Sequence, residues 1–189
     1  MRLELLSSKK KKTLFLLTLS PIKKESPEKL KKRGVTMKTL LQIADFIKPE
    51  RIIRINSTDK KEALKELISV ITKSEEITDN KIFEKEIFKR EKLMSTGIGY
   101  EIAIPHIRHK SIKDFVIAVG TSNEGIKYKS IDDKPVKLIF MIGASDKQDK
   151  EYIKLLSRIV LRLKDDSFKN ALINAKTSED VFEIIKSHK

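Results

Sequence analysis

The chain has 189 residues, of which 39% are hydrophobic and 36% are charged, so it is long enough to form one domain with a buried core and an extension. It contains no cysteine and three histidines, which excludes disulfides, thiolate metal sites and cysteine nucleophiles. Its formal net charge of +14 would suit a nucleic-acid or membrane partner if that charge were spread over the whole surface.

The charge is instead concentrated in residues 1–36, which hold 11 Lys or Arg against 3 Asp or Glu, whereas residues 37–189 hold 30 against 24. The apolar run at residues 14–19 is far shorter than the roughly 20 residues that span a bilayer. We therefore predict a basic extension, residues 1–36, that is poorly ordered and dispensable, followed by a mixed-charge domain, residues 37–189. A misassigned start upstream of Met37 would explain the extension. A basic arm that contacts nucleic acid or lipid is the alternative.

The first part of the domain is predicted to contain one strand and two helices. Residues 52–55 form a short β-prone run. The Ser-Thr-Asp side chains of residues 57–59 can cap a helix, and apolar residues then recur at helical spacing as far as Ile71. Asp79 begins a second helix that ends near Met94.

The middle of the domain is predicted to be β-structure. A loop punctuated by glycines, residues 95–101, leads into it. The last of its strands is nearly continuous in apolar residues, as is typical of a central strand. The strands are predicted at residues 102–104, 115–119 and 136–142, and the turns at residues 123–125 and 132–135.

Three helices are predicted at the end of the chain. The first presents an apolar face from Tyr152 to Leu163, Asp165 caps the second, and residues 177–180 open the third. The resulting order is one strand, two helices, three strands and three helices. This order predicts an α/β (α+β) fold, a three-layer α/β/α domain with a mixed central β-sheet.

The segment that is most informative about function runs from Arg90 to His106. Gly97 and Gly99 allow the backbone to turn with N–H groups directed at an anion. Pro105 restricts its own φ and the residue before it, so His106 is presented from a stiff backbone. Such a histidine could act as a nucleophile, a general base or a ligand. On these residues alone, a structural histidine is the better interpretation.

Residues 95–106, Ser-Thr-Gly-Ile-Gly-Tyr-Glu-Ile-Ala-Ile-Pro-His, resemble the signature of the IIA domains of the fructose/mannitol class of the bacterial sugar phosphotransferase system and of their nitrogen-related regulatory relatives. The similarity extends from about residue 40 to the C-terminus and includes residues 132–136 and the helix around Leu155. In that family the histidine of the Pro-His pair receives a phosphoryl group from the phosphohistidine of HPr, and a transport-type member passes it to a IIB component. The resemblance implies that His106 is this catalytic residue, phosphorylated on its tele nitrogen.

The same resemblance places a phosphate-binding arginine at Arg90 and implies that Ser95 and Thr96 add hydroxyl donors. A planar guanidinium suits this role because it offers paired N–H donors to two phosphate oxygens. Phosphoryl transfer itself depends mainly on positioning and on stabilisation of charge. Without the resemblance, Arg90 would be interpreted as a solvated residue of a charge-rich helix.

Several residues depart from the family pattern or stay open. Tyr152 stands where many members carry a second histidine. Its hydroxyl could orient the active histidine, but it cannot become a cation near neutral pH, and its helical spacing fits core packing equally well. Glu101 stands where the family usually has glycine, and a carboxylate there would repel a phosphate unless it is directed away. His109 could be a partner of His106 or a solvated loop residue, and His188 lies beside the C-terminus.

The resemblance implies a cytoplasmic phosphotransferase component of sugar uptake, with HPr and a IIB component as partners and a possible association with the membrane IIC complex. No cofactor and no metal site is expected, because the histidines are scattered and no phosphate-binding glycine motif occurs. The alternative is a nitrogen-type regulator, in which phosphorylation of His106 controls partner binding. A nucleic-acid binder is a third interpretation, disfavoured because the basic stretches lack interleaved aromatic residues.

Overall fold

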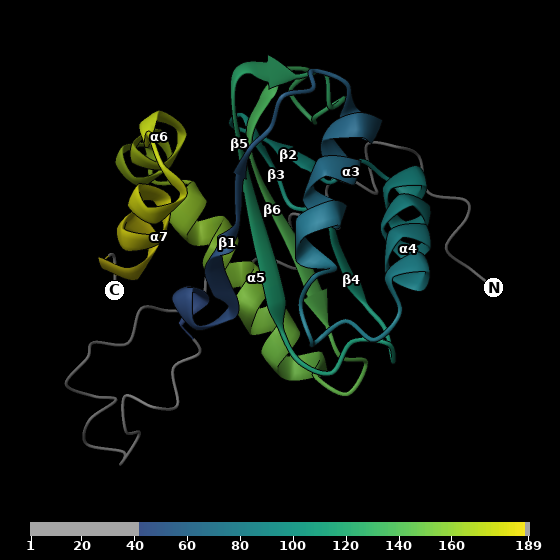
Figure 1. The fold of residues 1–189 in the computed structure, drawn as a ribbon. Coiled ribbons are helices and arrows are strands. Elements are labelled where there is room, and N and C mark those ends of the chain that lie inside the picture. The colour runs from purple at the N-terminus through teal and green to yellow at the C-terminus, as the bar shows by residue number, and fades with distance from the viewer. Residues whose placement is uncertain (1–41, 188–189) are drawn as a thin grey trace. The chain divides into compact units, whose positions relative to one another are not determined.

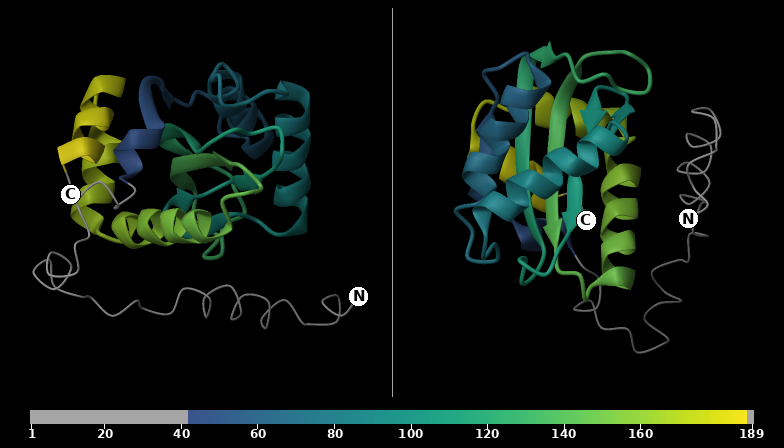
Figure 2. Two further views of the ribbon diagram at one scale, coloured as in Figure 1. Left: turned by 90° about the horizontal axis from the view of Figure 1, so that it is seen from below. Right: turned by 90° about the vertical axis from the view of Figure 1, so that its right-hand side faces the viewer.

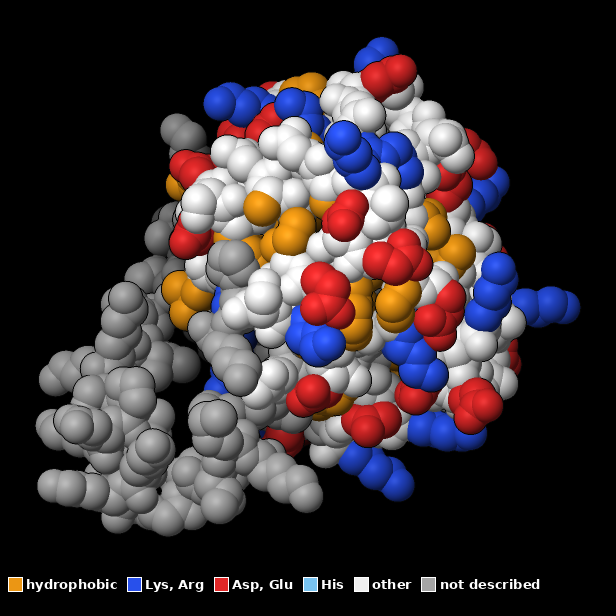
Figure 3. All heavy atoms as spheres, turned by 60° about the vertical axis from the view of Figure 1, so that its left-hand side comes forward, with side chains coloured by type: hydrophobic (Ala, Val, Ile, Leu, Met, Phe, Trp, Pro, Cys, Tyr) orange, Lys and Arg blue, Asp and Glu red, His pale blue; other side chains and the backbone are white. Residues whose placement is uncertain are grey.

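The computed structural model describes residues 42–187, and every structural statement below refers to that part of the chain. The predicted extension, residues 1–36, lies outside the described residues. None of the helices between residues 42 and 187 has both the length and the apolar character that crossing a bilayer requires. The surface in Figure 3 carries basic and acidic side chains side by side, with small apolar groups between them.

Strands and helices follow one another in a single α/β arrangement. The strands are β1 (Ile47–Arg54), β2 (Gly97–Gly99), β3 (Ile102–Ala103), β4 (His106–Arg108), β5 (Val116–Ile126) and β6 (Val136–Ala144). The helices are the 3-10 helix η2 (Ile43–Phe46), α3 (Lys60–Ile71), α4 (Asn80–Leu93), α5 (Asp149–Leu163), α6 (Asp166–Asn174) and α7 (Ser178–Ser187).

The six strands form one mixed sheet in the order β1-β5-β6-β3-β2, and β4 also pairs with β6. β1 and β5 are parallel, whereas β5 and β6 are antiparallel. Helices α3 and α4 cover one face of the sheet, and α5, α6 and α7 lie on the other (Figure 1). The prediction of an α/β fold with a mixed central sheet is confirmed.

The helix starts follow from side-chain capping. The carboxylates of Asp59, Asp79 and Asp165 accept backbone N–H groups in the first turns of α3, α4 and α6. Each such cap satisfies donors that have no partner inside the helix and contributes about 1 kcal/mol. At the start of α7 the Thr177 hydroxyl accepts the N–H of Asp180. The predicted N-termini of these helices are therefore confirmed.

The β-structure differs from the prediction in several places: the first strand, predicted at residues 52–55, is Ile47–Arg54, and the strand predicted at residues 115–119 extends to Ile126. The sequence predicts three strands between α4 and α5, whereas the structure has five. The additional strands β2 and β4 are three residues long, which is too short for an alternating pattern to be recognised. The turn predicted at residues 123–125 is wrong, because these residues lie within β5, where the pairing with β6 shifts register. Gly125, at φ 84°, provides the positive φ that such a bulge uses.

Strands β5 and β6 form the centre of the core. Val116 and Ala118 of β5, and Ile139 and Met141 of β6, belong to the same buried cluster as the apolar residues of α3 and α4. The residues between them point to the opposite face, because successive side chains of a strand alternate. Both faces of the two strands are therefore covered, which explains why β6 is nearly continuous in apolar residues.

An interrupted strand positions the candidate site. β3 and β4 pair in parallel with β6 one after the other, and Ile104 and Pro105 separate them. The Pro105 carbonyl accepts the N–H of Ile142 at 2.9 Å, so the chain follows β6 through the interruption. His106 is consequently the first residue of β4, at an edge that α4 and α5 approach from the two faces of the sheet (Figure 2).

Candidate functional site

The imidazole of His106 is held by its own strand. Its Nδ1 lies 2.6 Å from the carbonyl oxygen of Ile104, and the side chain is half-buried. A carbonyl oxygen can only accept a hydrogen bond, so Nδ1 carries the proton and donates it. The lone pair of the neutral ring is therefore on Nε2, the nitrogen that the carbonyl does not hold.

The surroundings of His106 keep the ring neutral. The pKa of His106 is lowered to about 4, mainly by burial and to a smaller extent by the Arg90 charge, while the Ile104 carbonyl and the Glu91 carboxylate act in the opposite direction. The charged form is disfavoured mainly because burial removes its hydration. At neutral pH the ring is therefore an uncharged base with an available nitrogen, which is the form in which histidine acts as a nucleophile.

Arg90 lies in the last turn of α4, and its charge acts on the candidate site. One guanidinium N–H group donates to the Met94 carbonyl at 2.9 Å. The charge of Arg90 lowers the pKa of both His106 and Tyr152. Arg90 therefore acts electrostatically on His106, although 15 residues separate them in the sequence. The bond to Met94 uses one of the five N–H donors of the guanidinium.

Tyr152, on the first turns of α5, packs against the ring of His106. The ring centroids of His106 and Tyr152 are 6.0 Å apart, with 59° between the ring planes. The Arg108 guanidinium lies 5.4 Å from the centroid of the same tyrosine ring. Burial raises the pKa of Tyr152 to about 12, so its hydroxyl stays protonated at neutral pH. Tyr152 is half-buried beside His106 and is not a core residue, which places it where an orienting role is feasible.

A buried carboxylate that the sequence reasoning missed connects three elements beneath the site. Glu91 of α4 forms an ion pair with Lys60 of α3 at 2.6 Å, and it accepts hydrogen bonds from the backbone N–H and the hydroxyl of Thr96, at 2.9 and 2.6 Å. Its position four residues after the buried Ile87 places it on the apolar face of α4. A charged residue in that register was the signal that could have identified it.

Ser95 and Thr96 do not occupy equivalent positions. Thr96 is buried, and its hydroxyl donates to Glu91 and lies 3.0 Å from the hydroxyl of Tyr128. The hydroxyl proton of Thr96 is therefore already donated to Glu91. Ser95 is half-buried, and its oxygen lies 3.4 Å from the Lys60 ammonium. Of the two hydroxyls, only that of Ser95 is held by long hydrogen bonds that a ligand could replace.

Gly97 serves close packing. A Cβ atom at this position would lie 2.8 Å from the Cα of Ser130, so no larger residue fits. The backbone N–H of Gly97 bonds to the Ser95 hydroxyl at 3.3 Å, which contradicts the prediction that it faces an anion. The glycine is needed because the backbone of β2 approaches the segment after β5 closely.

The carboxylate of Glu101 is directed to lysines. It lies 2.8 Å from the Lys137 ammonium and 3.9 Å from that of Lys169. Its backbone φ is 65°, in the left-handed region that favours glycine, which accounts for the glycine that the family pattern has there. His109 bonds to Ser111 through Nδ1 at 2.8 Å, as a residue of the connection after β4. His188 lies outside the described residues.

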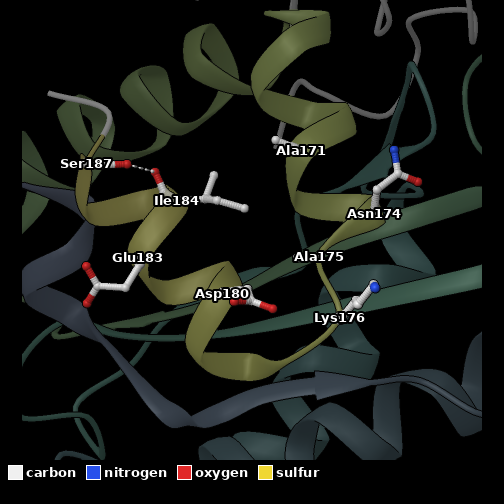
Figure 4. Close-up of a pocket in the computed structure, with 8 residues that line it drawn as sticks. All are labelled: Ala171, Asn174, Ala175, Lys176, Asp180, Glu183, Ile184 and Ser187. Carbon is white, nitrogen blue, oxygen red and sulfur yellow. Dashed lines mark hydrogen bonds between the residues drawn. The ribbon is translucent and has the colours of Figure 1, made fainter.

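Other parts of the described chain offer no comparable chemistry. Between residues 42 and 187, no group of three or more His, Cys, Asp or Glu side chains could hold a metal ion. A hollow of about 510 Å³ lies between α6 and α7, and its polar side chains include Lys176, Asp180 and Glu183 (Figure 4). None of the residues predicted to form the site lines this hollow.

A neutral imidazole with one anchored nitrogen, under the influence of an arginine charge, has the properties that a histidine phosphocarrier requires. The family model described as "Phosphoenolpyruvate-dependent sugar phosphotransferase system, EIIA 2" matches residues 31–188. The chain therefore belongs to the type 2 EIIA family of that phosphotransferase system, whose IIA domains are phosphotransferase components.

Both branches of the family are among its relatives. The chain is 33% identical over 151 residues to the nitrogen regulatory protein of Escherichia coli strain K12, covering 78% of this chain and 91% of that protein. It is 32% identical over 136 residues to the fructose-specific EIIABC component of Bacillus subtilis strain 168, covering 72% of this chain. The matched part is only 21% of that longer protein.

Solved structures show the same fold. The nitrogen regulatory protein IIA-Ntr of Neisseria meningitidis is similar with a TM-score of 0.70 and 27% identity, covering 76% of this chain and 98% of that one. The IIA mannitol protein of Escherichia coli is similar with a TM-score of 0.63 and 22% identity, covering 74% and 98%. A further similar structure, with a TM-score of 0.62 and 19% identity, covers 75% and 98% and is the complex of Escherichia coli enzyme IIA mannitol with phosphorylated IIB mannitol.

Proposed function

We propose that this protein is a cytoplasmic phosphocarrier that accepts a phosphoryl group from phospho-HPr on Nε2 of His106 and passes it to a IIB component. The observation that carries this proposal is the neutral, Nδ1-anchored ring of His106 beside the charge of Arg90. The complex of a similar IIA protein with phosphorylated IIB mannitol supports a IIB component as the acceptor. The fructose-specific relative supports a role in sugar uptake.

In the first step the Nε2 lone pair of His106 attacks phosphorus. A new P–N bond forms while the P–N bond of the donor phosphohistidine breaks, and the electrons of that bond return to the donor ring. The positive charge that develops on the His106 ring is shared with the Ile104 carbonyl through Nδ1–H. Because this carbonyl is fixed in the strand, it stabilises the charge without having to reorient.

Arg90 would stabilise the group in transit. The phosphoryl group carries its negative charge on its equatorial oxygens, and a nearby guanidinium offsets that charge with paired N–H donors. Ser95 could add a weaker hydroxyl donor, whereas Thr96 would act indirectly by fixing the backbone after α4. The second step is the reverse of the first, with a nucleophile of the IIB component as the acceptor.

The decisive experiment mixes the purified protein with phosphoenolpyruvate, enzyme I and HPr and measures acid-labile phosphate. One phosphate per chain is expected. His106→Ala should abolish it, and Arg90→Ala should slow its uptake by about 100-fold, while Arg90→Lys should lose less. The matched control His109→Ala should label normally. Label on His109 or on a serine would refute the assignment.

A second candidate function is a nitrogen-type regulator controlled by phosphorylation of His106. It is supported by the 33% identity to the nitrogen regulatory protein of Escherichia coli. In addition, Tyr152 lies beside His106 where many family members have a second histidine. A tyrosine cannot carry the positive charge that a histidine could supply during transfer to a IIB component. Incubation of the phosphorylated protein with candidate IIB proteins separates the two functions, since only a carrier loses its label to them. Adjacent IIB and IIC genes would favour transport.

A further inference from the structure

We propose that Arg108 is a second phosphate-binding residue of this site, held by Asp149 before phosphorylation and transferred to the phosphoryl group once His106 carries it. This inference rests on the proposed function. The family resemblance implies no role for Arg108 or Asp149.

The strand geometry places Arg108 beside the active ring. Ile107 points into the cluster of α3 and α4, so His106 and Arg108 both project from the opposite face of β4. Residues two apart on a strand lie about 7 Å from each other along it. The long side chain of an arginine can cover that distance to reach a phosphoryl group on Nε2.

Tyr152 connects the two side chains. Its ring centroid lies 6.0 Å from that of His106 and 5.4 Å from the guanidinium carbon of Arg108. The guanidinium and the imidazole thus both lie beside the same aromatic ring, the guanidinium at a distance typical of a cation–π contact. Arg108 and Arg90 both lower the pKa of Tyr152, whereas the charges that act on the unphosphorylated His106 are those of Arg90 and Glu91.

In the unphosphorylated protein, Arg108 is paired with Asp149, the first residue of α5. The side chain of Asp149 is 70% exposed and that of Arg108 is 35% exposed. An ion pair of such exposure is weak, because water and salt screen it. A phosphoryl group with up to two negative charges and three acceptor oxygens is the stronger partner for a guanidinium.

If Arg108 leaves the ion pair, the Asp149 carboxylate is still stabilised by its surroundings. It lies in the first turn of α5, where the helix dipole stabilises a carboxylate, and it is well exposed to water. Exchange of Arg108 from Asp149 to the phosphoryl group would therefore open a link between β4 and α5. The charged and titratable groups that surround the phosphoryl position are Arg90 and Glu91 of α4, Arg108 of β4, and Asp149 and Tyr152 of α5.

The test uses the two partners of this ion pair, because the proposal predicts opposite effects for them. Arg108→Met should raise the apparent pKa of the phosphoryl group, followed by phosphorus NMR, by about 0.5 to 1 pH unit. It should also reduce the equilibrium constant for transfer from phospho-HPr about ten-fold. Asp149→Asn should shift both quantities the other way, because it removes the competitor for Arg108. Arg108→Lys should give an intermediate result.

Arg162→Met is the control on α5, since the Arg162 guanidinium stacks on Phe168, 5.5 Å from its ring centroid, and should change neither quantity. A purely structural ion pair would give shifts of the same sign in Arg108→Met and Asp149→Asn, and that result, or no shift in either, overturns the inference while the proposed function stands. Failure of the wild-type protein to take up phosphate overturns both together.

Discussion

At the scale of single residues, the chemistry of His106 follows from two opposed demands on one imidazole. Burial favours the neutral ring, which has a lone pair to donate, whereas the phosphorylated ring needs a partner for its developing charge. The Ile104 carbonyl meets the second demand without cancelling the first, because the pKa of His106 still falls to about 4. In the proposed function, a ring with this pKa needs no deprotonation at neutral pH before it attacks phosphorus, so no separate base is required.

The lowered pKa of His106 should make the folded protein less stable at acidic pH. The folded protein binds the His106 proton less tightly than the unfolded chain, whose histidine has its ordinary pKa of 6.5. His106 therefore contributes its full share of stability above pH 6.5, and this share is lost as the pH falls toward 4. At 1.36 kcal/mol per pH unit the loss reaches about 3 kcal/mol. Between pH 6.5 and pH 4, the free energy of unfolding, measured with urea, should fall in the wild type and in His106→Gln. The fall should be larger in the wild type by about 3 kcal/mol.

An NMR titration of the His106 ring gives the same quantity directly, with a midpoint expected near pH 4. A midpoint near the ordinary value of 6.5, with parallel acid profiles for the two proteins, would contradict the electrostatic account of the site. The comparison with His106→Gln is essential, because carboxylates titrate in the same range and contribute equally to both proteins.

At the scale of elements, local chemistry predicted the helices well and the short strands poorly. Capping aspartates such as Asp59 and apolar residues at a spacing of 3.6 are properties of neighbouring residues, so the starts of α3 and α4 could be found from the sequence. Strands β2 and β4 exist because β3 and β6 offer them backbone partners. β4 pairs with a strand more than 30 residues further along the chain, as His106 with Ile142, and strands of two or three residues such as β2 and β3 carry no periodic pattern of their own.

The buried carboxylate of Glu91 links α4 to α3 and to the segment that contains Thr96. Glu91→Ala removes the acceptor for Thr96 and leaves the Lys60 ammonium, which is 2.6 Å away in the wild type, without its partner. We expect a loss of about 3 to 5 kcal/mol in the free energy of unfolding, since breaking a buried ion pair leaves a poorly compensated charge. Slower phosphorylation should accompany it, because Glu91 fixes the segment between Arg90 and the glycines.

Glu86→Ala is the matched control on the same helix. Its pair with Lys89, at 3.1 Å, lies at the surface, and removing such a pair should cost less than about 1 kcal/mol. Equal losses in the two variants, measured by urea unfolding, would show that the buried network adds nothing beyond the helix propensity of α4.

At the scale of the molecule, the site exists only where the two helical layers meet at one edge of the sheet. The sequence and the family resemblance pointed to His106, Arg90 and Tyr152. The structure places the rings of His106 and Tyr152 beside each other, and the charge of Arg90 acts on both. The sequence and the resemblance did not point to Arg108 or Glu91, because the roles of these residues depend on α5 and α3, which fold against them from distant parts of the chain. The pKa of His106 is likewise a property of the assembled layers and could not be read from its neighbours in sequence.

The same scale decides which part of the chain is needed. All buried apolar residues of the described core lie between Ile47 and Ile185, so a chain that begins at Met37 should fold with an unchanged thermal midpoint and take up one phosphate from phospho-HPr. It should also elute from a cation exchanger at lower salt, because residues 37–189 hold 30 basic against 24 acidic side chains while the full chain holds 41 against 27.

A chain that begins at Glu50 is the control, since it lacks the buried Ile47 and the start of β1 and should be destabilised. Loss of phosphate uptake on removal of residues 1–36 alone would instead assign them a part in docking the donor, because a positive segment can steer an acidic surface toward the site.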